Sequence, residues 1–176
     1  MEDSMSKNSR TQKIVITALL AALTCVATMI IRIPSPLKGY INLGDCVVLC
    51  AGWMLPLGYG FFAAGLGSAL ADVFSGYVLY APVTFVIKGA MALVAALIFK
   101  AIHKSGKERK SQDTLARIIA GVVAEVVMVA GYYVFEAFLY GPISSLANIP
   151  ANAVQATAGV ILGCVLIKVL KKIKVA

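Results

Sequence analysis

The sequence predicts an all-α integral membrane protein, a bundle of six transmembrane helices with both termini in the cytoplasm. Hydrophobic residues make up 60% of its 176 residues and charged residues only 14%, and the mean hydropathy is +0.89. Soluble domains are usually about 45–50% apolar and about 25% charged. Because so apolar a chain has too few polar side chains to cover a surface in water, a membrane bundle fits best.

The positions of the basic residues predict the topology. Thirteen of the 16 Lys and Arg residues form three clusters, and short basic segments beside apolar spans are typical of the cytoplasmic side. The net charge of +8 therefore indicates orientation, and no nucleic-acid partner is expected. The clusters consist of Lys7, Arg10 and Lys13; of Lys100, Lys104, Lys107, Arg109, Lys110 and Arg117; and of Lys168, Lys171, Lys172 and Lys174.

The first helix is expected at about 13–31, after a polar cytoplasmic tail at 1–12. The next apolar stretch, 43–76, would form a single helix of about 50 Å at 1.5 Å per residue. That length exceeds the ~30 Å hydrocarbon core of a bilayer. If the amino terminus and the basic loop 101–116 are both cytoplasmic, an even number of helices must separate them, so the stretch is predicted to hold two.

These two helices are expected at about 42–56 and 58–76, and both are short enough to be tilted or kinked. The break between them is predicted within MLPLGYG, where Pro56 and Gly58 interrupt the apolar run.

Three further helices complete the bundle, at about 80–100, 117–140 and 148–171. The segment 32–41 becomes an outer loop stiffened by two prolines, and the membrane domain as a whole covers 13–172. Both ends of this arrangement are cytoplasmic, as the basic clusters require.

Nearly every polar side chain within the apolar segments falls in the outer half of this topology, and only Glu125 lies nearer the midplane. A charge at a helix centre costs about 2.5–3.5 kcal/mol on insertion scales, and such groups usually face the bundle interior or a wet cavity. The sequence therefore predicts an outward-facing substrate pocket. Its candidate residues are Asn42, Asp45, Asp72, Tyr77, Tyr80, Lys88, Tyr132, Glu136, Asn148, Asn152 and Gln155.

Helical spacing supports shared faces. Asn148, Asn152 and Gln155 follow a step of four and then three, which places them on one side of a helix. Lys88 is expected to offset one carboxylate, either Asp72 or Asp45.

Two interpretations of these residues remain open. In the simpler one, Lys88 forms a structural salt bridge and the other polar residues only lie near lipid head groups. In the other, they line a small-molecule pocket with aromatic walls. The aromatic candidates are Trp53 or the tyrosines Tyr77, Tyr80, Tyr132 and Tyr133.

The cysteines do not suggest a metal or a disulfide site. The sequence has no CxxC pair, and its one histidine, His103, lies in the basic loop. No metal site and no cofactor are therefore expected on this chain, and the cysteines are interpreted as small buried hydrophobic residues. They are Cys25, Cys46, Cys50 and Cys164.

Four blocks resemble a known family. GYINLGDCVVLCAGWMLPLGYGFFAAGLGSALADVFSGY, APVTFVIKGAMALVAALIF, FEAFLYG and IPANAVQATAGVILG are similar, in this order, to the substrate-binding S components of energy-coupling factor (ECF) vitamin transporters. The likeness covers about residues 12–172 and is greatest to the group with hydroxymethylpyrimidine and riboflavin-type S components. It implies six helices with both ends cytoplasmic in a prokaryotic cell membrane. It also implies capture of a vitamin or vitamin precursor at the outer face.

The resemblance further implies partners. An S component docks on a transmembrane T component and two ATPase subunits to form an ABC-type importer, and ATP is hydrolysed by those partners. Small residues spaced Ala-x-x-x-Ala on the first helix form the docking surface in that family, and here Ala18 and Ala22 match. The outer loop 32–41 matches the loop that gates the family's binding site.

The charge of the predicted pocket limits the chemical class of ligand that it can bind. Three carboxylates, Asp45, Asp72 and Glu136, face one cation, Lys88, so the pocket disfavours organic anions. Carboxylates and amides suit neutral rings rich in donors. A hydroxymethylpyrimidine-like or pyridoxine-like ring is therefore expected, ahead of riboflavin.

Other function classes make different predictions. A stand-alone ion-coupled secondary transporter could relay protons through Asp72, Glu125 and Glu136, although no inverted repeat is evident. A membrane enzyme is less compatible, since the sequence has no P-loop and no HExxH motif. A purely structural subunit would bind no small molecule.

Overall fold

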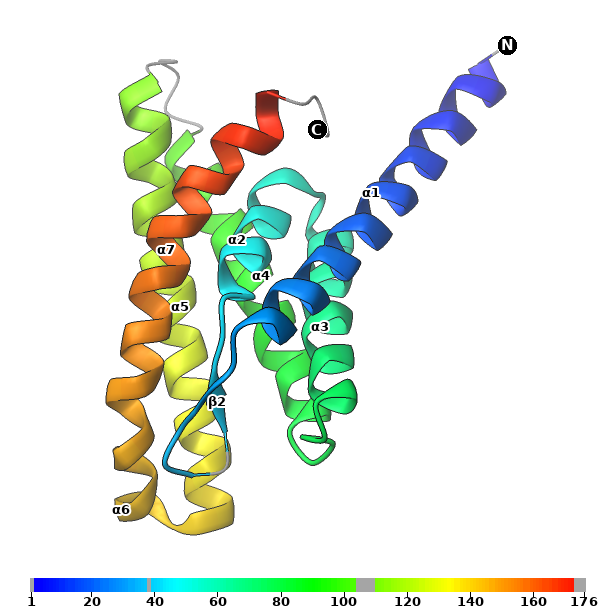
Figure 1. Cartoon of the computed structure of the whole chain (residues 1–176). Helices are drawn as coiled ribbons and strands as arrows, with labels where there is room; N and C mark the ends of the chain where they lie inside the picture. Colours follow the sequence, from blue (N-terminus) through cyan, green and yellow to red (C-terminus); the bar gives the residue numbers. More distant parts are fainter. Residues whose placement is uncertain (1, 38, 104–109, 173–176) are drawn as a thin grey trace.

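The computed structural model describes residues 2–37, 39–103 and 110–172, and most of this length is helical (Figure 1). A short hairpin follows the first helix, in which β1 (Ile33–Pro34) pairs antiparallel with β2 (Tyr40–Ile41). The helices are α1 (Glu2–Ile30), α2 (Asp45–Met54), α3 (Leu57–Phe74), α4 (Ala81–His103), α5 (Lys110–Tyr140), α6 (Pro142–Ser145), the 3₁₀ turn η1 (Leu146–Asn148) and α7 (Ile149–Lys172).

Within the described residues, five helical segments are long and apolar enough to cross a membrane, which confirms the predicted class. They are Arg10–Ile30, Leu57–Phe74, Ala81–His103, Gln112–Tyr140 and Pro142–Leu170. The six crossings and the cytoplasmic position of the termini stay predictions.

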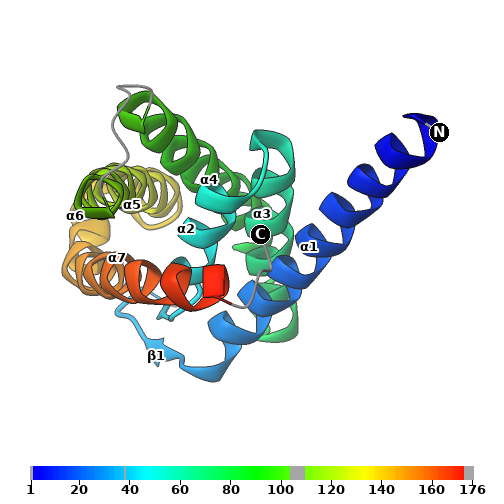
Figure 2. The same ribbon diagram turned by 90° about the horizontal axis from the view of Figure 1, so that it is seen from above.

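Helix α2 is the exception among the predicted spans. It has ten residues, so at 1.5 Å per residue it is about 15 Å long, half of a hydrocarbon core. Its first eight residues are buried, because α2 lies in the centre of the bundle and packs against α1, α3, α4 and α7 (Figure 2). A helix that no lipid touches does not need to match the thickness of the bilayer.

The break between α2 and α3 falls at Leu55 and Pro56, within the predicted MLPLGYG segment. Pro56 is extended, with φ −57° and ψ 150°, and its ring prevents α2 from continuing because it has no N–H to donate.

Two helices begin earlier than the sequence predicted. Helix α1 begins at Glu2 and not at 13, and α5 begins at Lys110 and not at 117. Neither added stretch contains glycine or proline, so nothing in the chain stops the helix. Five residues of the predicted tail and basic clusters lie outside the described residues: Met1, Lys104, Lys107, Arg109 and Lys174.

The connections segregate to two ends of the bundle. The start of α1, the end of α4, the start of α5 and the end of α7 lie at one end of the bundle. The hairpin, α6 and the α3–α4 turn lie at the other (Figure 1). We call the second end the hairpin end. This arrangement is compatible with the predicted topology, which stays a prediction.

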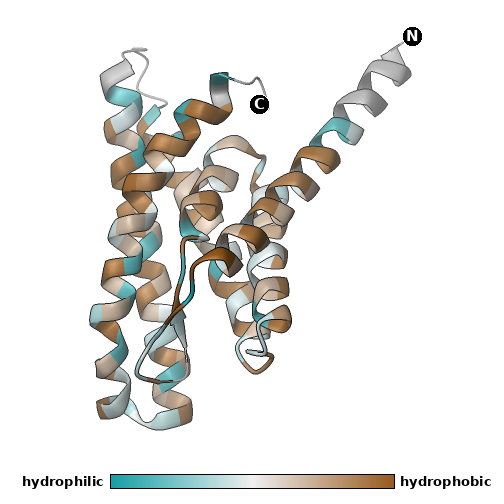
Figure 3. Ribbon diagram, in the orientation of Figure 1, coloured by the Kyte–Doolittle hydropathy of each residue, from teal (hydrophilic) through white to brown (hydrophobic). Residues whose placement is uncertain are grey.

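Large apolar side chains are exposed along α1, α5 and α7, among them Leu19, Val126 and Val165. Much of α1 and α7 is coloured hydrophobic in Figure 3. Close helix contacts use small residues: Gly67 of α3 lies against the Ala21 carbonyl of α1, and Gly52 of α2 lies against the backbone of Ala92 in α4. A side chain at either glycine would separate the two backbones.

Candidate functional site: a polar pocket under the hairpin

The hairpin segment is tied to the bundle by side chains from several helices. The Tyr40 hydroxyl donates to the Asp72 carboxylate of α3 over 2.5 Å. The Tyr80 hydroxyl donates to the carbonyl oxygen of Leu37 over 3.0 Å. The turn and the second strand of the hairpin are therefore fixed by residues that lie more than thirty positions further along the chain.

Two amides on the opposite wall complete the attachment. The Leu37 N–H donates to Asn148 Oδ1 over 3.4 Å, and the Asn42 N–H donates to Gln155 Oε1 over 2.9 Å. Asn42 in turn accepts the Gly44 N–H over 2.9 Å, which fixes the chain where it turns into α2.

Beneath the hairpin lies a small cavity of about 30 Å³, which we call the polar pocket. A cavity of this size holds about one water molecule. The pocket is lined by Ser35, Gly39, Tyr40, Asn42, Asp72, Tyr80, Tyr132, Glu136, Asn148, Asn152 and Gln155.

Glu136 is the acidic group of the α5 wall, and only 2% of it is exposed. Its Oε1 accepts a hydrogen bond of 2.7 Å from Asn148 Nδ2, but its Oε2 is buried without a partner in the described structure. A buried carboxylate oxygen with no donor is unfavourable by about 1–3 kcal/mol or more. The polar pocket thus presents an acceptor that the protein itself does not satisfy.

A buried ion pair forms the floor below the polar pocket. The Lys88 ammonium of α4 pairs with Asp45 Oδ1 at the start of α2, and Gln155 Nε2 donates to Asp45 Oδ2 over 2.6 Å. The sequence left Asp72 and Asp45 open as partners of Lys88, and the structure selects Asp45.

Tyr132 lines the polar pocket and also contacts the buried ion pair below it. Its hydroxyl lies 3.0 Å from Thr84 Oγ1, and the Lys88 ammonium sits 5.5 Å from the centre of its ring. The Lys88 ammonium thereby interacts with both the Asp45 carboxylate and the face of the Tyr132 ring.

The two tyrosines that hold the hairpin keep their protons. Burial, followed by the charge of the adjacent Asp72 carboxylate, raises the pKa of the Tyr40 hydroxyl. Burial, followed by contact with Tyr140 and the charge of Glu136, raises the pKa of Tyr80. Since tyrosine ordinarily titrates near pH 10, both hydroxyls remain hydrogen-bond donors at neutral pH.

The structure brings most of the predicted site residues together. Eight of the 11 line the polar pocket, while Asp45 and Lys88 lie directly below it and Tyr77 packs on Tyr40 with ring centres 4.7 Å apart. Their part in binding a ligand stays a prediction. The eight are Asn42, Asp72, Tyr80, Tyr132, Glu136, Asn148, Asn152 and Gln155.

Three residues that line the polar pocket were missed, and two of the aromatic candidates, Trp53 and Tyr133, lie away from it. Ser35, Gly39 and Tyr40 belong to the hairpin segment, where no helical spacing marks which residues face inward. Trp53 packs instead in the core near the other end of α2, and Tyr133 faces away from the polar pocket into a groove between α5 and α7.

The predicted docking residues lie elsewhere. Ala18 and Ala22 are exposed on α1, on the opposite side of the helix from buried Leu20 and Thr24. Large apolar side chains at Val15, Leu19 and Val26 are exposed on the same helix. This face of α1 packs on no other described helix.

The polar pocket offers carboxylate and amide acceptors and hydroxyl donors in an aromatic setting. Among the described residues, no group of three or more His, Cys, Asp and Glu side chains is placed to hold a metal ion. The arrangement suits reversible binding of a polar ring.

Comparisons with known proteins identify the family and the fold of this chain. Residues 8–172 match the sequence model of a family described as "ECF-type riboflavin transporter, S component". An uncharacterized protein in the gap 3′ region of Pyrococcus woesei is 38% identical over 149 residues, which is 84% of this chain and 93% of that protein. The solved S component of a bacterial ECF transporter has the same fold, with a TM-score of 0.67 at 22% identity over 93% of this chain and 98% of the other.

Proposed function

Because this chain belongs to the family of ECF-type riboflavin transporter S components, we propose that it captures a vitamin or vitamin precursor in the polar pocket under the hairpin. The observation that carries this proposal is the convergence of Asp72 of α3, Glu136 of α5, Asn148 of η1 and Gln155 of α7 on one pocket. Glu136 Oε2 in particular has no hydrogen-bond donor among the described residues, so a ligand N–H or O–H would satisfy it.

The hairpin segment must move for a ligand to bind. Vitamin-sized ligands occupy pockets of about 300 Å³ or more, whereas the polar pocket has about 30 Å³. Its roof consists of Ser35, Gly39 and Tyr40. The Ser35 N–H donates to the Gly39 carbonyl oxygen within the roof, and Tyr40 attaches the roof to the bundle through its hydrogen bond to Asp72 and its packing on Tyr77. Displacing this roof opens the polar pocket without disturbing the bundle.

The ligand we propose is a neutral ring rich in donors, such as a hydroxymethylpyrimidine-like or pyridoxine-like ring. With Lys88 paired to Asp45, no described cation is left over to bind an organic acid in the polar pocket. Riboflavin is the second candidate, because the matching family is described by that vitamin and its hydroxyl-bearing chain is also neutral and donor-rich.

The identity of the ligand is tested by purifying the full chain from its native host or a vitamin-replete host. Mass spectrometry of the small molecules released on denaturation should then identify a neutral vitamin ring. Flavin fluorescence in the released fraction would select riboflavin, and a bound organic acid would contradict the proposed ligand class.

Removing single charges from the polar pocket is expected to weaken binding. Glu136→Gln and Asp72→Asn keep shape and one acceptor oxygen, so the bundle and the Tyr40 bond can persist. Hydrogen bonds to charged groups contribute about 1.5–3 kcal/mol, so each variant should raise the vitamin's Kd by about 10- to 100-fold. Titration of purified variants by calorimetry measures the change.

The matched control is Asp113→Asn, a carboxylate-to-amide change at the opposite end of the bundle, where Asp113 pairs with Arg117 and His103. Its Kd should equal that of the unmodified chain. Unchanged affinity in both pocket variants would remove Asp72 and Glu136 from the site.

We further propose that this chain acts with a transmembrane T component and two ATPase subunits, docking through the exposed Ala18 and Ala22 face of α1. On this proposal the chain binds no cofactor of its own, and its partners hydrolyse the ATP. A stand-alone ion-coupled carrier is the competing function.

Reconstitution separates these two functions. The lone chain in liposomes should bind vitamin on the outside and accumulate none in the lumen, with or without a proton gradient. Adding the T component and ATPases with ATP should start uptake, whereas gradient-driven uptake by the lone chain would establish the carrier instead.

A further inference from the structure

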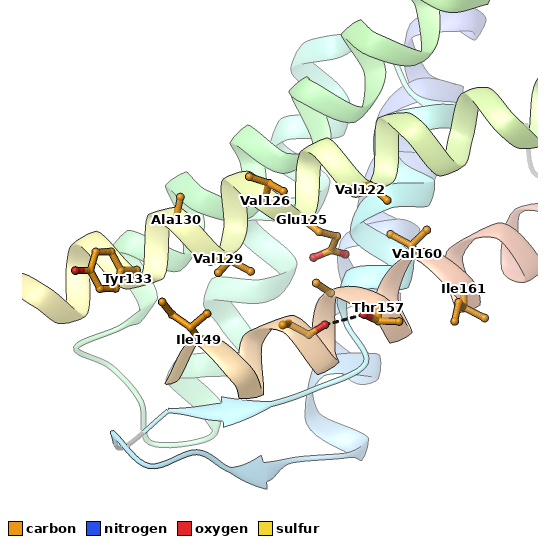
Figure 4. A pocket seen from close by; sticks show the side chains of 12 residues that line it. Val122, Glu125, Val126, Val129, Ala130, Tyr133, Ile149, Thr157, Val160 and Ile161 are labelled. Carbon is orange, nitrogen blue, oxygen red and sulfur yellow. Dashed lines mark hydrogen bonds between the residues drawn. The ribbon is translucent and has the colours of Figure 1, made fainter. Parts of the chain in front are cut away.

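A second cavity, of about 530 Å³, lies between α5 and α7 and shares no lining residue with the polar pocket. We call it the lateral groove. Its walls are almost entirely aliphatic, with Val122, Val126 and Val129 on α5 facing Ile149 and Val160 on α7 (Figure 4). Along α5 it extends from Val122 to Tyr133, about 16 Å of helix.

One carboxylate points into this apolar space. Glu125 projects from α5 between the two helices (Figure 4). It is 2% exposed, and neither of its carboxylate oxygens has a hydrogen-bond partner in the described structure. An unpaired buried carboxylate is costly, and proteins normally satisfy such groups.

No salt bridge is made to Glu125 among the described residues. Lys88, the nearest buried ammonium, is already paired with Asp45, whose side chain packs near Glu125 across Gly159. Gly159 leaves the space that the Glu125 carboxylate occupies, because a Cβ at that position would collide with it. The Thr157 hydroxyl in the wall donates to Ala153 and not to Glu125.

We infer that the lateral groove binds an amphiphilic amine, with its ammonium on Glu125 and its apolar body along α5 and α7. Charge complementarity selects this occupant. A lipid acyl chain would fill the aliphatic walls but leave the carboxylate without a donor, whereas an ammonium donates up to three charge-assisted hydrogen bonds. The volume of the lateral groove lies within the usual range for small-molecule sites, about 300–1,000 Å³.

This site is independent of the proposed vitamin pocket, so either can fail without the other. Its test uses three probes with one alkyl chain and different heads: dodecylamine, dodecanol and dodecanoate. Native mass spectrometry of the full chain released from neutral maltoside micelles counts the bound probes over a titration. One amine should bind with a Kd about tenfold or more below that of the alcohol, and the carboxylate should bind least.

Two variants locate the site. Glu125→Gln preserves size and should bring the amine and the alcohol within about twofold of each other. Ala156→Leu adds bulk to the groove wall and should weaken all three probes, while Asp113→Asn serves as the carboxylate control outside the groove.

Three results would overturn the inference. Equal binding of the three probes to the unmodified chain would mean that the lateral groove accepts any alkyl chain. Equal binding of amine and alcohol would mean that Glu125 carries its own proton, and an amine preference that survives Glu125→Gln would place the ammonium elsewhere.

Discussion

Replacing Ala18 and Ala22 together with tryptophan is expected to abolish vitamin uptake while leaving the vitamin's Kd within about twofold of its original value. Both alanines are exposed on the face of α1 that no described helix covers. Small residues let two helices approach closely in lipid, and two indole rings would hold a partner helix several ångströms away. Loss of docking removes transport but leaves the polar pocket, at the far side of the bundle, intact.

Uptake is measured in liposomes that contain the T component and ATPases, and binding is measured on the isolated chain. Val86→Trp is the control, because Val86 is 57% exposed on α4 and carries the same change on a different helix. Transport by the double variant at the unmodified rate would show that α1 is not the docking face.

The largest effect on stability is expected from Lys88→Met. Lys88 and Asp45 are 2% and 0% exposed, so removing the ammonium leaves a buried carboxylate whose side-chain donor, among the described residues, is Gln155. Breaking a buried ion pair by deleting one partner typically costs about 3–5 kcal/mol. The free energy of unfolding, measured by denaturation in mixed micelles, should fall by that amount.

A second substitution separates the charge from the packing. Adding Asp45→Asn to Lys88→Met removes the unpaired charge and should recover most of the loss, since neutral replacement of a buried pair is often tolerated. Lys100→Met changes an exposed lysine of the same helix and should shift stability by less than about 0.5 kcal/mol. Equal losses for Lys88→Met and Lys100→Met would refute the structural role of the ion pair.

Much of the architecture could be predicted from the sequence, and the predicted family is confirmed. Hydropathy located the long helices because lipid contact demands continuous apolar runs, and Pro56 marked a break that local chemistry enforces. Helical spacing grouped Asn148, Asn152 and Gln155 correctly on one wall of the polar pocket, because those residues share a regular repeat.

What could not be predicted depends on tertiary contacts. Tyr40 reaches Asp72 through a hairpin whose register comes from contacts with other helices, so no local periodicity marks it. The choice of Asp45 over Asp72 for Lys88 depends on how deeply α2 enters the bundle. The position of Glu125 in the wall of the lateral groove likewise depends on the packing of α5 against α7.

The hairpin is fastened by residues that also line the polar pocket: Asp72, Tyr80, Asn148 and Gln155. If the vitamin binds as proposed, it competes with the protein's own backbone and tyrosine for the same partners. Its apparent affinity is then its intrinsic affinity reduced by the fraction of time the roof stands open. Substitutions that strengthen or weaken these hydrogen bonds therefore change the apparent affinity for the vitamin. The groups that recognise the ring need not change.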